Sequence, residues 1–225
     1  SHTPLPILGK MFHHLASEAS VPVVAHLDHG YTEGECIEAI ECGFTSVMFD
    51  GSRLSLQENI DRTARIAELA HEADISCEGE IGFVGYSDGE QSNGTNPSEA
   101  NIFAKDTKVD AMAISVGNIH LQKHKEGNLD LERIRQIEQV TSIPLVVHGG
   151  SGVPVKQRSF LSRNSKICKF NIGTELRMTF GDALRKSIVS HPDQFDRVEI
   201  LRKTHEPLVQ ATRKVLNAFK PKSGN

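Results

Sequence analysis

Apolar and polar residues alternate along the chain in a pattern that predicts a parallel α/β protein. Short runs rich in β-branched residues are followed by longer stretches in which apolar residues recur at helical spacing. Repetition of a strand and a helix is typical of βα units, whose strands lie parallel in one sheet. Strands are predicted at residues 21–27, 46–49, 76–81, 111–116, 144–147 and 167–172. Helices are predicted at residues 4–20, 33–42, 57–73, 97–106, 130–140, 154–163, 175–190 and 196–218, the last with a break or kink at Pro207.

The spacing of the predicted strands fits two architectures. Successive strands begin about 25 to 35 residues apart, which is the size of one unit of a (β/α)₈ barrel or of a doubly wound sheet. Six strands suit the doubly wound sheet better, because a barrel needs eight. However, nearly every predicted strand ends in reactive or glycine-rich residues, whereas a doubly wound sheet concentrates its chemistry at one switch point. We therefore expect an α/β fold of the (β/α)₈ TIM barrel type.

The domain organisation follows from the same pattern. Apart from residues 83–97, which are rich in Gly, Ser, Asp and Asn, no stretch has the composition of a linker. We therefore expect a single TIM-barrel domain over residues 1–225, with a C-terminal helical extension at about 191–220. The first methionine of the chain is Met11. We expect the first two strands of the barrel to be missing from this chain, with the gap beside residues 21–27.

Composition and charge narrow the class of protein. Of the 225 residues, 38% are hydrophobic and 24% are charged, which is enough to form a buried core. A net charge of −4 with mixed signs does not favour a nucleic-acid partner, and no apolar run approaches the ~20 residues of a membrane span. The four cysteines form no metal-binding or redox doublet, so we expect reduced thiols in a cytoplasmic protein.

Three histidines lie directly after predicted strands and are candidate metal ligands. They are His29, His120 and His148. On a barrel their side chains would converge above the core, giving three imidazoles and an open fourth position, as in a catalytic Zn²⁺ site. A chain with eleven histidines also places some of them near strand ends by chance. The residues by themselves leave both interpretations open.

Asp28 is a candidate for proton transfer because it is adjacent to His29. Neighbouring residues of a regular strand face opposite sides of the sheet, so both side chains reach one site only if the strand ends or bulges there. Gly30 makes such an irregularity plausible. The alternative is that Asp28 caps a helix or supports a ligand without taking part in catalysis.

Two glycine-containing stretches follow the last two predicted strands. Their sequences are HGGSG at residues 148–152 and NIGTE at residues 171–175. Glycines let backbone N–H groups approach an anion, Ser151 and Thr174 add hydroxyl groups, and a helix beginning near Glu175 directs its positive end toward the same place. This is the usual position of a phosphate site in a barrel. Ordinary turn chemistry, with Thr174 as an N-cap, is the alternative.

The order of these motifs resembles that of a known enzyme family. Along the chain the motifs are HLDHG, DGS, EGEIG, VGNIH, IPLVVHGGSG and NIGTEL. They are similar to those of the class II, zinc-dependent ketose-bisphosphate aldolases, which include fructose- and tagatose-bisphosphate aldolases. The resemblance runs from about residue 10 to about residue 190. It implies a TIM barrel and a lyase that reversibly cleaves a phosphorylated ketose into dihydroxyacetone phosphate and an aldehyde.

The resemblance also implies roles for individual residues. It implies one catalytic Zn²⁺ on the three histidines, an acid/base role for Asp28 and an alternative metal position that involves Glu80. A monovalent cation is often found near the phosphate in this family. The phosphate-binding positions that it implies are Gly117, Gly149, Ser151, Asn171 and Thr174.

Two departures from the family pattern concern loop residues. The family usually has glycine directly after its second histidine, where this chain has Leu121. Family members often carry one or two acids shortly after the glycines that follow Glu80. Here Asp88 is the candidate, and it would transfer the C–H proton.

Two functions of other classes stay open beside the aldolase. A metal-assisted hydrolase on a similar barrel would need a second metal with a bridging carboxylate, for which Glu80 is the candidate. A barrel homologue without catalytic activity would serve as a binding scaffold. For the aldolase we expect a small phosphorylated sugar as substrate, a role in carbohydrate metabolism such as glycolysis, no membrane or nucleic-acid partner, and a homodimer or homotetramer.

Overall fold

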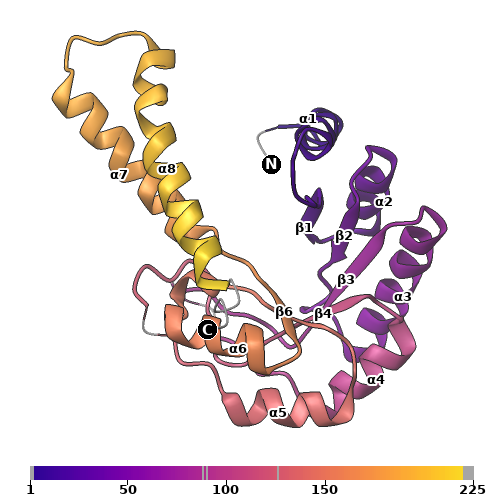
Figure 1. Ribbon diagram of the computed structural model, residues 1–225. Helices are drawn as coiled ribbons and strands as arrows, with labels where there is room; N and C mark the ends of the chain where they lie inside the picture. Colours follow the sequence, from indigo (N-terminus) through magenta and orange to yellow (C-terminus); the bar gives the residue numbers. More distant parts are fainter. Residues whose placement is uncertain (1–2, 88, 90, 126, 220–225) are drawn as a thin grey trace. The chain divides into compact units, whose positions relative to one another are not determined.

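The computed structural model describes residues 3–87, 89, 91–125 and 127–219, in which strands and helices alternate (Figure 1). The strands are β1 (His26–Gly30), β2 (Ser46–Phe49), β3 (Ser76–Ile81), β4 (Ala111–Ile114), β5 (Leu145–Val147) and β6 (Ile167–Phe170). The helices are α1 (Leu5–Ser17), α2 (Glu33–Glu41), α3 (Leu56–Glu72), α4 (Pro97–Thr107), α5 (Leu131–Val140), α6 (Val155–Asn164), α7 (Thr174–Ser190) and α8 (Arg197–Phe219), with a 3₁₀ turn η1 (Gly150–Gly152).

The strand order agrees with the barrel type that the sequence predicts and not with a doubly wound sheet. The sheet has the order β1-β2-β3-β4-β5-β6, and the pairs from β1–β2 to β4–β5 are parallel. A doubly wound sheet reverses its strand order at a switch point, whereas the strands of a (β/α)₈ barrel follow one another in chain order. The described part of the chain is therefore an α/β fold with six parallel strands of a partial TIM barrel.

The chain divides into two compact units. The first unit contains α1 to α5, β1 to β4 and most of β5, and the second contains η1, α6 to α8, β6 and the loop that follows β4. The first unit comprises Ser1–Phe83, Asn93–Val116 and Asp130–Val146, and the second comprises Val84–Ser92, Gly117–Leu129 and Val147–Asn225. Folding of residues 1–225 as a single domain stays a prediction.

The core of the first unit lies between the sheet and its helices. On β2, Val47, Met48 and Phe49 are all fully buried. Burial on both faces is typical of a strand of a parallel sheet covered by helices, and it explains why β2 is a continuous apolar run. Met48 packs with Ala113 and Val146 in a buried cluster. This cluster holds β2, β4 and β5 together and so fixes the strand ends that carry the polar residues.

The strand prediction was wrong for the first strand. Pairing begins at His26, opposite Ser46, and not at residue 21. Residues 21–24 are exposed and lie outside the sheet, although their β-branched composition resembles a buried strand. Pro22 lacks the N–H group that a ladder position requires, which disfavours a strand at this point.

The other elements were predicted closely. β2 and β3 have the predicted bounds, whereas β4 and β6 end at Ile114 and Phe170, two residues earlier than predicted. α8 contains Pro207 in its interior, so of the expected break or kink the break does not occur, and the kink stays a prediction. None of the helices in the described residues is both long and apolar enough to cross a membrane.

Candidate functional site

The carboxyl end of β1 contains a bulge, one of the two irregularities that would let Asp28 and His29 reach one site. Leu27 pairs with Val47 and Gly30 with Phe49, so three residue steps on β1 lie opposite two on β2. His29 has a φ of 57°, in the left-handed region. A side chain at position 30 would collide with the sulfur of Cys36, so a glycine is required there. Because of this bulge, the simple alternation of side chains is lost at the end of the strand.

Three side chains with metal-binding atoms lie together in the first unit. The Nδ1 atom of His29 is 2.7 Å from Asp50 Oδ2 and 4.0 Å from Glu80 Oε2. One ligand atom from each residue lies within 4.8 Å of the other two. The Asp50 and Glu80 side chains are only 8% and 2% exposed. An imidazole and two buried carboxylates are a donor set that suits a divalent cation.

Asp50 was not predicted as a site residue, although the DGS motif was recognised as a polar strand end. Burial alone would raise the pKa of Asp50, but hydrogen bonds from His29 and Ser52 outweigh burial and lower this pKa below its ordinary value. Ser52 donates to Asp50 Oδ1 from its backbone N–H at 3.1 Å and from its hydroxyl at 2.6 Å. With the Nδ1 proton of His29 donated to ionised Asp50, Nε2 carries the lone pair that can bind a metal.

Two further imidazoles are neighbours in the second unit. The ring centroids of His120 and His148 lie 5.8 Å apart, with the rings tilted by 50°. His148 is completely buried, and its backbone carbonyl accepts a hydrogen bond from the Asn118 amide at 3.1 Å. The His120 ring stacks on Tyr86 at 5.0 Å, and its backbone N–H donates to the Gly85 carbonyl. The second and third predicted histidines are thus held together within one unit.

The predicted phosphate-binding residues also lie in the second unit. The Gly150 N–H donates to the Asn171 carbonyl at 2.9 Å, and the Glu175 N–H donates to the Ser151 hydroxyl at 3.1 Å. These bonds confirm that the two glycine-containing stretches lie side by side. Gly149 has a φ of 64°, and a side chain there would collide with the Ile119 carbonyl. Glycine is therefore required at this position for both conformation and space.

The other residues singled out from the sequence differ in backbone conformation and exposure. Gly117 has a φ of 93°, and Thr174 begins α7. Asp28 is exposed beside the partly buried His29. Leu121 has a φ of 58°, so its backbone keeps the left-handed conformation that glycine adopts readily. Asp88 lies outside the described residues.

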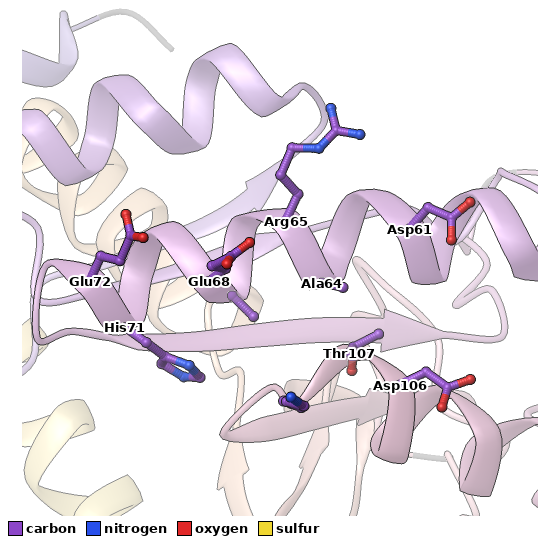
Figure 2. A pocket seen from close by; sticks show the side chains of 10 residues that line it. Asp61, Ala64, Arg65, Glu68, His71, Glu72, Asp106 and Thr107 are labelled. Carbon is purple, nitrogen blue, oxygen red and sulfur yellow. The ribbon is translucent and has the colours of Figure 1, made fainter.

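A cavity of about 730 Å³ lies elsewhere in the first unit and was not predicted. Figure 2 shows acidic and basic side chains from α3 at this cavity, among them Asp61, Arg65 and Glu68, together with Asp106 from α4. It is lined by helix residues and by the loop that follows α4, and not by the carboxyl ends of the strands. Since barrel active sites form at those strand ends, we do not assign the active site to this cavity.

Comparison with known proteins identifies the family that the chain resembles. A family model described as class-II fructose-bisphosphate aldolase matches residues 1–223. A sulfofructosephosphate aldolase of Alkalicoccus urumqiensis is 35% identical over 211 residues, which cover 90% of this chain and 72% of that protein. A 6-phospho-5-dehydro-2-deoxy-D-gluconate aldolase of Shouchella clausii (strain KSM-K16) is 38% identical over 198 residues, which cover 86% of this chain and 66% of that protein.

The fold is also that of a solved aldolase. The crystal structure of the YdjI aldolase from Escherichia coli K12 superimposes with a TM-score of 0.79 at 26% sequence identity. The match covers 99% of this chain and 78% of the YdjI chain. The chain therefore spans about two thirds to four fifths of the length of these relatives.

Proposed function

Because the chain belongs to the class II fructose-bisphosphate aldolase family, we propose that it reversibly cleaves a phosphorylated ketose into dihydroxyacetone phosphate and an aldehyde. The members of this family are aldolases, which are carbon–carbon lyases. The proposal is carried by one observation: residues to which the family resemblance gives a role lie close together within each unit, His29 with Glu80 in the first and His120 with His148 in the second.

We propose that His29, His120 and His148 bind one Zn²⁺, as in the family. Two observations support this assignment: the carboxylate of Asp50 orients the His29 ring, and the other two imidazoles are neighbours in the second unit. Glu80 would provide the alternative metal position together with His29 and Asp50. When bound, the ion would polarise the carbonyl oxygen of the substrate.

Asp28 would remove the proton of the substrate hydroxyl at the bond that is cleaved, and return it in the reverse direction. Its exposed side chain on the β1 bulge supports this role, because the bulge breaks the alternation that would separate it from His29. We assign the C–H proton to Asp88, on the family resemblance alone.

The substrate phosphate would bind where the two glycine-containing stretches meet in the second unit. Backbone N–H groups near Gly117 and Gly149 and the hydroxyls of Ser151 and Thr174 would donate to its oxygens. Asn171 belongs to the same site, and a monovalent cation would lie close to the phosphate. The relatives are named for different phosphorylated substrates, so the proposal is for the class of ketose phosphates.

The proposal also concerns the whole protein: its complete barrel, its location, its oligomeric state and its metabolic role. Within the described residues, β1 ends the strand order and pairs only with β2. We propose that two further strands lie beside β1 and complete the eight-stranded barrel. We also propose a cytoplasmic homodimer or homotetramer that acts in carbohydrate metabolism.

Metal analysis of histidine variants, combined with an aldol-cleavage assay, tests this function. Replacement of His29, His120 or His148 by alanine should remove the stoichiometric metal and abolish cleavage across a panel of ketose monophosphates and bisphosphates. His205→Ala is the matched control, because His205 is exposed on α8. Full metal content in all three variants would contradict the site. Two metals per chain without aldol cleavage would favour the metal-assisted hydrolase.

A further inference from the structure

Arg158 is a buried arginine with few hydrogen-bond partners in the second unit. It lies on α6, and its side chain is only 1% exposed. Its Nη2 atom donates to Glu175 Oε2 at 3.2 Å, whereas Nε and Nη1 have no hydrogen-bond partner among the described residues. A guanidinium group that is removed from water and only partly bonded is energetically costly. This cost indicates a role for Arg158 other than stability.

Glu175 connects Arg158 to the proposed phosphate site. One of its carboxylate oxygens accepts from Lys125 Nζ at 2.7 Å, and the other accepts from Arg158. Its backbone N–H donates to the Ser151 hydroxyl. Glu175 therefore links α6, the loop that follows β4, and the η1 turn to the first turn of α7. Since the Ser151 oxygen accepts from Glu175, the Ser151 proton is directed to another acceptor.

The charge of Glu175 would by itself oppose phosphate binding. Burial would raise the pKa of Glu175, but the hydrogen bond from Lys125 and the charges of Arg158 and Lys125 outweigh burial and lower it. Glu175 is therefore a carboxylate at neutral pH, one residue beyond Thr174. A carboxylate at this place repels a phosphate dianion unless cations neutralise it. The Lys125 side chain is 40% exposed and thus screened by water, whereas Arg158 is not.

The cavity next to Ser151 is lined by charged side chains of both signs. Ser151 and Glu175 line a cavity of about 240 Å³ together with Lys123, Lys125 and Asp182. Two positive and two negative side chains line this cavity, and one of the two acids, Asp182, also pairs with Arg185. Arg158, which is buried and bonded to Glu175, adds a further positive charge to this region.

We propose that Arg158 is a positioning residue for the substrate phosphate. Its guanidinium holds Glu175 on the first turn of α7 and neutralises the carboxylate, so that Ser151 and the N-terminus of α7 bind a phosphate dianion. This inference rests on the proposed function, because it concerns the phosphate site of the same reaction. Arg158 itself does not contact the reacting atoms.

Titration of the full chain with inorganic phosphate, followed by calorimetry, tests the proposal. Arg158→Met should weaken phosphate binding by about tenfold, which corresponds to the loss of one close charge interaction. It should raise the KM for a ketose phosphate with little change in kcat. Arg163→Met is the matched control, because Arg163 is exposed on the same helix, and it should bind phosphate like the wild type.

A second substitution separates neutralisation from a merely structural role. If Arg158 acts by compensating Glu175, the double variant Arg158→Met/Glu175→Gln should recover phosphate binding to within about threefold of the wild type. Glu175→Gln alone should bind phosphate at least as tightly as the wild type, which keeps the test decisive if Arg158→Met does not fold. Unchanged binding by Arg158→Met, or weaker binding by Glu175→Gln, would overturn the inference alone. Failure of the wild-type chain to bind phosphate would overturn the proposed phosphate site as well.

Discussion

Asp28 and His29 are adjacent in sequence, yet the proposed mechanism gives them different tasks. His29 would bind the metal, whereas Asp28 would move a proton without being a ligand. Asp28→Ala should therefore keep the stoichiometric metal but reduce aldol cleavage on the order of 10²-fold or more. Metal analysis and steady-state kinetics on the same sample measure both effects, with the exposed α3 residue Asp61 replaced as a control. Normal turnover by Asp28→Ala would assign the proton transfer to Asp88 or to a water molecule.

Leu121 allows a test of backbone strain next to a proposed ligand. With a φ of 58°, its L-configured side chain costs roughly 1–2 kcal/mol, whereas glycine loses about 0.5–1 kcal/mol through its greater freedom in the unfolded chain. Leu121→Gly should therefore raise the free energy of unfolding by up to about 1.5 kcal/mol. Leu121→Ala keeps the backbone strain and should not raise the free energy of unfolding. Urea unfolding measures both variants, and equal midpoints for glycine and alanine would show that φ is not the cause.

At the scale of the element, hydrophobic periodicity predicted those strands and helices whose bounds are set by residues nearby in the sequence. β2 and β3 were predicted residue by residue, since their apolar runs are bounded by polar turns. The capping box of Thr32 and Glu35 begins α2 at the predicted place. β1 was misplaced because residues 21–24 have the composition of a strand, and only pairing with Ser46 shows where the ladder begins. Register depends on tertiary pairing and cannot be derived from composition.

For the candidate site too, features set by local sequence were predicted, and features set by tertiary contacts were missed. Candidate site residues that follow strands were found from the sequence, because the end of a parallel strand is visible there. In a barrel, active sites form at these strand ends. The role of Asp50 was missed because its contact with His29 depends on the bulge in β1. Arg158 was missed for a different reason: arginine on a helix is ordinarily exposed, and its burial depends on how α6 packs in the second unit.

At the scale of the whole molecule, the outer edge of β1 has a predictable consequence. Within the described residues no strand pairs with this edge, and Val21, Val23 and Val24 before it are 64%, 47% and 63% exposed. An open strand edge beside exposed apolar side chains is a template for pairing with another chain. We therefore expect the 225-residue chain by itself to associate, with a mass in solution above that of one chain.

A charge placed beside the edge tests the origin of this association. Val24→Lys should lower the mass of the associated chain, because a lysine cannot be buried against a second copy without the loss of its hydration. Val189→Lys on α7 provides the control, since Val189 is 80% exposed and distant in sequence from β1. Size-exclusion chromatography with light scattering over a range of concentrations measures the mass of both variants. Dissociation by Val189→Lys and not by Val24→Lys would show that the second unit associates, and that the β1 edge is not the contact.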